Sequence, residues 1–73
     1  MIIRYSRHAK RQMKWREITK EDVEDTLLHP EIMIDSNRGR KNVLKHIGKK
    51  YLKVTFTQKG EQLIVITAVD KNR

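Results

Sequence analysis

The chain has 73 residues, which is enough for one small domain and too few for the folds that hold large cofactors, so we expect no cofactor. Its formal net charge of +8 favours a polyanionic partner, with nucleic acid first because phosphate contacts dominate such affinities. The absence of cysteine excludes disulfides, thiol nucleophiles and thiolate zinc sites. No apolar run reaches membrane-spanning length and no signal-peptide core is recognisable, so we expect one cytoplasmic domain over 1–73, with no membrane partner.

The first two predicted elements are a short strand at 2–5 and a basic helix from about 7 to 16. The β-prone residues at 2–5 favour an edge strand. Ser6 follows and is a typical N-cap, because its hydroxyl can accept from a free amide of the first helical turn. From 4 to 16 the chain carries six Lys or Arg residues, one His and no carboxylate. This composition predicts a helix that lies close to phosphate.

Helical spacing divides the side chains of this first helix into distinct rows. Ala9 and Met13 share one stripe, which we expect to face the core. His8, Gln12 and Arg16 follow each other at intervals of four residues and form a line beside that stripe. A side chain at this border can be held by packing and still reach a ligand.

An acidic segment at 17–35 holds seven of the nine carboxylates and contains the second predicted helix. Thr19 is its predicted N-cap, and Asp22 three residues later completes an arrangement like a capping box. Pro30 ends the helix, because a residue before proline favours extended geometry. We expect the buried side of this helix to consist of Val23, Leu27 and Leu28.

Four strand patterns follow the proline, at 31–35, 41–47, 51–57 and 63–69, separated by turns near 37–39, 48–49 and 59–61. The third run alternates most clearly, and its predicted inward residues are Leu52, Val54 and Phe56. The last run is apolar on both faces, which is typical of a central strand. We therefore expect an α+β fold in which a short N-terminal strand and two consecutive helices accompany a four-stranded, mainly antiparallel sheet.

With both helices on one face of the sheet, the other face remains uncovered. Its outward residues are expected to include Lys45 or His46, together with Lys53, Thr55 and Tyr51. A basic, slightly aromatic sheet face is a suitable platform for nucleic acid.

The residues of the first helix also suggest a family. The relevant positions are Ser6, His8-Ala9, Met13, Arg16, Ile18, Thr19, Val23 and Pro30, followed by Gly39-Arg40, Lys45, 50–54 and 65–67. This pattern resembles the small "His-Ala … Met … Arg-Gly-Ile" domains of unknown function that are allied to the BrnT and RelE toxins. Two positions depart from the family pattern: Gln12 stands where many members carry arginine, and Glu17 where glycine is usual.

The resemblance implies a toxin of a toxin–antitoxin pair that cleaves messenger RNA, free or on the ribosome, without a metal. Attack of a ribose 2′-hydroxyl on the adjacent phosphate needs a base, an acid and cations for the developing charge. The predicted catalytic residues are His8, Arg16, Lys45 and Lys53. The predicted nucleic-acid contacts are Arg7, Arg11, Gln12, Trp15, Arg40, His46 and Tyr51. A cognate acidic antitoxin is the expected protein partner, and self-association is left open.

Other interpretations of the same residues stay open. His8 can be a packed imidazole at a helix start, Arg16 a cation at a helix end, and Trp15 a half-buried packing residue. His29 and His46 do not combine with His8 at metal-ligand spacing, so no metal site is predicted. The alternative functions are a non-catalytic nucleic-acid-binding or interaction module on the same fold, or a structural domain whose charge serves solubility.

Overall fold

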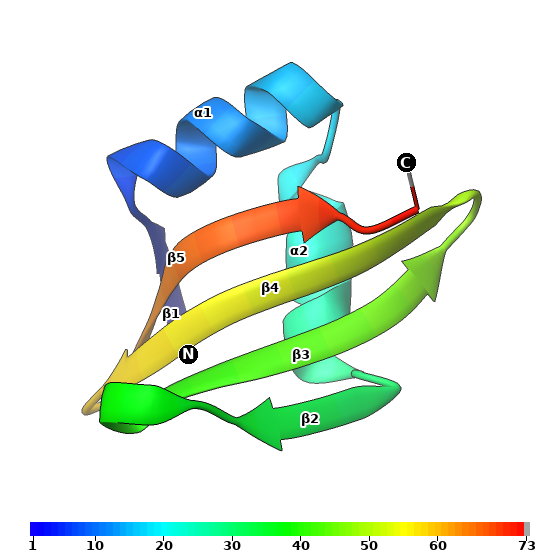
Figure 1. Ribbon diagram of the computed structural model, residues 1–73. Coiled ribbons are helices and arrows are strands. Elements are labelled where there is room, and N and C mark those ends of the chain that lie inside the picture. Colours follow the sequence, from blue (N-terminus) through cyan, green and yellow to red (C-terminus); the bar gives the residue numbers. More distant parts are fainter. Residues whose placement is uncertain (73) are drawn as a thin grey trace.

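The computed structural model describes residues 1–72 as two helices that cover one face of a single twisted sheet (Figure 1). In spatial order the five strands are β1 (Ile2–Tyr5), β5 (Gln62–Asp70), β4 (Lys50–Lys59), β3 (Arg40–Ile47) and β2 (Ile32–Asp35). The pairing of β1 with β5 is parallel and the other three pairings are antiparallel. The predicted α+β class is confirmed. The sheet has five strands because the short N-terminal strand joins it as an edge.

Both helices begin at the caps that the sequence predicts. Helix α1 (Arg7–Arg16) starts after Ser6, whose Oγ accepts from the Ala9 amide at 3.0 Å. Helix α2 (Lys20–Leu28) starts after Thr19, whose side chain and that of Asp22 form a reciprocal capping box. These contacts satisfy amides that a helix start otherwise leaves without partners, so each start is fixed locally.

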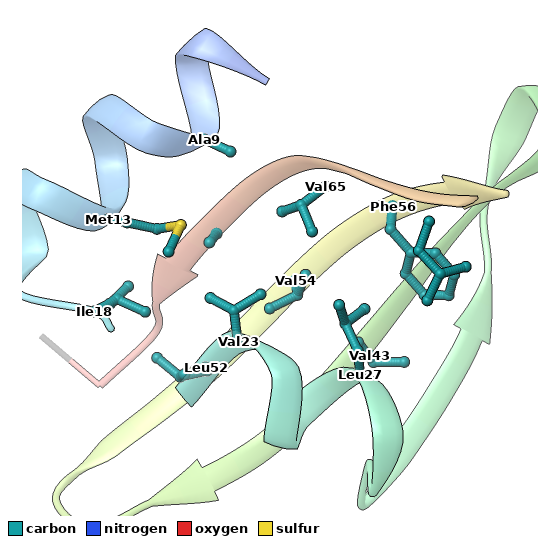
Figure 2. Packing of buried hydrophobic residues seen from close by; sticks show 12 residues of the cluster. Ala9, Met13, Ile18, Val23, Leu27, Val43, Leu52, Val54, Phe56 and Val65 are labelled. Atoms are coloured by element: carbon teal, nitrogen blue, oxygen red, sulfur yellow. The ribbon is translucent and has the colours of Figure 1, made fainter. Parts of the chain in front are cut away.

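The core lies between the helices and the sheet (Figure 2). Ala9 and Met13 from α1 point toward the sheet, as predicted from their stripe. The full cluster of buried residues is Ala9, Met13, Ile18, Val23, Leu27, Val43, Leu52, Val54, Phe56, Leu63, Val65 and Ala68.

The prediction that Leu28 of α2 lies in the core is wrong. Leu28 is 53% exposed, whereas Thr26 is fully buried and its Oγ1 donates to the Asp22 carbonyl at 2.8 Å. Val23, Thr26 and Leu27 share one side of the helix at spacings of three and four residues. Leu28 lies about 100° further round, so this last helical residue points away from the sheet.

Strand β5 lies between β1 and β4, as its apolar character predicts, and it contains a bulge. Thr55 pairs with Thr67 and Phe56 with Val65, which leaves Ile66 as an extra residue. The bulge shifts the phase of the alternation. The inward residues of β5 are therefore Leu63, Val65 and Ala68. Without the bulge, the alternation would continue from Val65 to Thr67.

Two turns connect β2, β3 and β4. The β3–β4 hairpin turns at Gly48-Lys49, where Gly48 has a φ of +58° that suits glycine. A 3₁₀ turn at Asn37–Gly39 joins β2 to β3. Within residues 1–72, neither helix has the length and apolar character that crossing a membrane requires.

Candidate nucleic-acid interface

The sheet face opposite the helices carries the side chains of five rows of cross-strand neighbours. Directly paired residues share a face, so the register assigns every strand residue to one side. We call the uncovered side the open face. Its rows are Ile2, Gln62 and Lys59; Arg4, Ile64, Thr57 and Arg40; Thr67, Thr55, Asn42 and Ile34; Val69, Lys53, Leu44 and Ile32; and Tyr51 with His46.

The open face combines cations and small hydrogen-bonding groups with aliphatic side chains, among them the exposed Ile32 and Ile34 of β2. Arg4, Arg40 and Lys53 supply positive charge, and none of the described residues in these rows carries a carboxylate. At the centre, Thr55 Oγ1 donates to Asn42 Oδ1 at 2.6 Å. This surface is therefore suited to phosphate and ribose groups, which combine negative charge with hydrogen-bonding oxygens.

An aromatic pair closes one end of this face. The His46 and Tyr51 rings are stacked, with centroids 4.1 Å apart and an interplanar angle of 18°. His46 Nδ1 lies 2.9 Å from Glu31 Oε1, and this hydrogen bond lowers the pKa of Glu31 below its usual value. The stack is thus fixed in orientation by a neighbouring carboxylate, and its edge adjoins the cationic rows.

Helix α1 borders the open face through its Gln12 flank. Gln12 Oε1 accepts from the Ala68 amide at 3.1 Å, which places this flank against the outer side of β5. Lys10 lies on the other flank, in a hollow that it shares with Lys20 at the start of α2. By helical geometry, His8 and Trp15 project on the same side of α1 as Gln12.

A hollow of about 340 Å³ lies where α1 ends. It is lined by Trp15, Arg16, Glu17, Lys50 and Asp70, which come from α1, the start of β4 and the end of β5. The Arg16 guanidinium lies 5.5 Å from the centroid of the Trp15 ring, a cation–π contact. Lys50 Nζ donates to the Glu17 carbonyl at 2.9 Å and ties the helix end to the β3–β4 hairpin.

The four predicted catalytic residues do not all lie together. Lys53 is on the open face, whereas Lys45 pairs with Leu52 on the helix side and forms an ion pair with Asp25 at 3.1 Å. His8 is exposed on α1. Of the two residues considered for the outward position on β3, His46 faces outward and Lys45 inward, because Lys45 is in phase with the buried Val43.

The predicted nucleic-acid contacts fall into two groups. Arg40, His46 and Tyr51 are on the open face, whereas the α1 group is Arg7, Arg11, Gln12 and Trp15. Arg4 and Asn42 on the open face were not among the predicted residues, whereas Thr57 lies outward as the alternation of its strand predicts. Arg4 had a usable signal, since Ile3 and Tyr5 on either side pack toward the core. Asn42 carries no signal that separates it from ordinary strand residues.

Among residues 1–72, no three His, Asp or Glu side chains come together in a group that could hold a metal ion. The other titratable group with a marked change is Tyr5 on the helix side. Burial, together with the Glu24 carboxylate to which its hydroxyl donates at 3.3 Å, raises the pKa of Tyr5 to about 12.

The fold and this surface define a small α+β protein with a basic, uncovered sheet face. The chain belongs to the DUF4258 family, a domain of unknown function whose model matches residues 5–73. No curated protein and no solved structure matches the chain. The predicted membership of a family of unknown function is thereby confirmed. None of the comparisons connects the chain to the BrnT or RelE toxins, so that part of the resemblance stays a prediction.

Proposed function

We propose that this protein binds single-stranded RNA on the open face of its sheet, beside the Gln12 flank of α1. The observation that carries the proposal is the arrangement of Arg4, Arg40 and Lys53 on one uncovered face with the stacked pair His46 and Tyr51. Stacking on aromatic side chains together with phosphate contacts is a common basis for binding single strands.

The geometry suggests how a strand of RNA is held. Cations on three different strands of the sheet can contact phosphates along one RNA strand, while Asn42 and Thr55 offer hydrogen bonds to ribose hydroxyls. A base that leaves the strand at the end of the face can stack on Tyr51. Because these contacts address the backbone and the π-face of any base, binding at this face has little dependence on sequence.

The toxin context belongs to the same proposal. A positively charged face that binds RNA also binds an acidic peptide, so a cognate acidic antitoxin that covers the open face would block access of RNA. Within residues 17–35 the chain is itself acidic, which makes the opposite side of the molecule less suitable for such a partner.

A second candidate function is metal-independent cleavage of the bound RNA, and it is favoured by the position of His8. Its exposed imidazole lies in the first turn of α1, on the same side of the helix as Gln12. In this reaction His8 takes the proton of a ribose 2′-hydroxyl, the new 2′-O–P bond forms and the bond to the 5′ oxygen breaks. Arg16 and Lys53 stabilise the negative charge that develops on the non-bridging phosphate oxygens, and the departing 5′ oxygen takes up a proton from water. Lys45 has no part because Asp25 neutralises it on the helix side.

One set of variants tests both functions. Arg40→Gln with Lys53→Gln is expected to weaken RNA binding, whereas Lys41→Gln serves as the control because Lys41 pairs with Phe56 on the helix side. Cleavage is read from the integrity of messenger RNA after induction of the wild type, His8→Ala and Arg16→Ala. Intact messenger RNA with wild-type protein would exclude the nuclease and leave the binding function in place. Equal binding by the open-face variant and the control would exclude the binding surface.

A further inference from the structure

The hollow at the end of α1 combines the parts that recognition of a nucleobase requires. It is open to solvent, has a volume of about 340 Å³ and joins an indole, two cations and two carboxylates. Lys50, on its rim, directly precedes Tyr51 of the aromatic pair, so the hollow continues the open face around the end of the sheet.

The indole of Trp15 is available for stacking. It belongs to the only tryptophan in the chain and is 77% exposed, which is far from the burial expected of a packing residue. The Arg16 guanidinium lies over the ring and fixes one side of it. A base that stacks on the indole therefore meets a preoriented surface with a cation close to its phosphate.

The two carboxylates of the hollow differ in what they can still accept. Asp70 Oδ1 already accepts from the amides of Tyr51 at 3.0 Å and Asn72 at 2.9 Å. The Glu17 side chain is exposed, and its backbone is held at the helix end by the contact between its carbonyl and Lys50. Glu17 is thus the group that can receive hydrogen bonds from a ligand in the hollow.

A carboxylate that only accepts hydrogen bonds discriminates among the four bases. The Watson–Crick edge of guanine presents two adjacent donors, N1–H and the N2 amino group, which match the two oxygens of a carboxylate. On the same edge, adenine, cytosine and uracil each have a donor next to an acceptor. The acceptor and the second carboxylate oxygen repel each other. The chemistry of the Glu17 side chain therefore selects guanine.

We propose that this hollow binds an unpaired guanine of the RNA, with the base stacked on Trp15 and its donor edge on Glu17. The inference rests on the proposed function and adds a base preference to a face that has little of its own. Arg16 and Lys50 contact the phosphate of the same nucleotide, which links the hollow to the strand on the open face.

The test uses the fluorescence of Trp15, because the only tryptophan reports on stacking directly. The wild-type chain is titrated with short RNAs that are identical except for guanine, adenine, cytosine or uracil at the central position. The guanine RNA is expected to quench the signal and to bind about tenfold more tightly than the other three. Equal affinity for all four RNAs would overturn the proposal.

Substitutions at Glu17 and at a control position test whether Glu17 causes the guanine preference. In Glu17→Gln one oxygen becomes a donor, so the guanine preference is expected to disappear while the other RNAs bind as before. Glu61→Gln makes the same charge change in the β4–β5 turn and is expected to keep the preference. Retained preference in Glu17→Gln would also contradict the proposal.

The open-face variant separates this inference from the function on which it depends. Lys53→Gln is expected to lower the affinity for all four RNAs by the same factor. The tenfold ratio between the affinity for the guanine RNA and the affinities for the others is expected to remain. If wild-type protein binds RNA without a base preference, only the hollow is rejected. If it binds no RNA at low salt, the open face is rejected as well.

Discussion

The side-chain oxygen of Gln12 accepts a hydrogen bond from the backbone amide of Ala68 at 3.1 Å, across 56 positions of the chain. The contact lies just beyond the end of β1, whose pairing with β5 stops at Tyr5 and Val65. A second α1 contact comes from Ser6, whose Oγ donates to the Ile66 carbonyl at 2.9 Å. These side chains form hydrogen bonds with backbone groups of β5 in the part of the strand that does not pair with β1. Gln12 therefore has a structural role in docking α1.

This role predicts the effect of introducing arginine, the residue that the family resemblance leads us to expect at position 12. Gln12→Arg replaces an acceptor by a side chain that can only donate, so the Ala68 amide loses its partner. The free energy of unfolding in urea is expected to fall by about 1–3 kcal/mol. Gln12→Glu keeps an acceptor and is expected to lose less. Arg11→Ala is the exposed control with little effect, and a Gln12→Arg protein as stable as wild type would refute the structural role.

Glu17, at a position where the family resemblance leads us to expect glycine, has a left-handed backbone with φ of 56° and ψ of 41°. Glycine adopts this conformation without the steric cost that a Cβ brings, and it is the common residue at this helix position. We expect Glu17→Gly to raise the free energy of unfolding by about 1 kcal/mol. Glu17→Ala keeps the Cβ and is expected to give no gain. Thermal or urea unfolding of both variants decides the matter, since a similar gain from alanine would rule out backbone strain as the cause.

Lys45 and Lys53 lie on adjacent strands and are expected to respond in opposite ways to the same substitution. Lys45→Met breaks the ion pair with Asp25, in which the lysine side chain is 20% exposed, and we expect about 0.5–1 kcal/mol of lost stability with unchanged RNA affinity. Lys53→Met is expected to weaken RNA binding with little change in stability. Urea unfolding and RNA titration of both variants supply the measurements. Reduced RNA affinity in Lys45→Met would show that Lys45 takes part in RNA binding.

The contact between Glu31 and His46 predicts a dependence on pH. The hydrogen bond from His46 lowers the folded-state pKa of Glu31, so its stabilising effect is present above the unfolded pKa. The effect is lost as the pH falls through the folded pKa, when the carboxylate takes up a proton. In His46→Ala the Glu31 resonance should titrate at a higher pH by nuclear magnetic resonance. An unchanged titration would show that His46 does not set this pKa.

Much of the fold follows from local sequence signals. Ser6, Thr19 and Pro30 bound the helices through capping and proline chemistry that acts within a few residues. The alternation in β4 identifies Leu52 and Val54 as inward residues because one face of the sheet is buried. These features need no knowledge of distant partners.

Other features depend on long-range pairing. The alternation in β3 puts Lys45 and His46 on opposite faces, but the choice between them is made by the register with β4 and by Asp25 on α2. The bulge at Ile66 changes the inward phase of β5 only because β4 continues without an extra residue. Contacts of this kind cannot be obtained from the periodicity of one segment.

The candidate site was predicted in part for the same reason. The open face brings together Arg4 and Arg40, which lie on separate strands and are far apart in the sequence. The hollow joins the end of α1 to Lys50 and Asp70, so no single segment indicates it. Trp15 was predicted as a contact because it is the only tryptophan and falls on the polar side of its helix.

The central claim is that RNA lies on the open face, and the salt dependence of binding tests it most directly. For single strands, log affinity falls with log salt by about 0.7 for each phosphate contact. Arg40→Gln with Lys53→Gln is therefore expected to reduce this slope by about 1.4, while Lys41→Gln leaves the wild-type slope. Equal slopes for wild type and the double variant would contradict the claim.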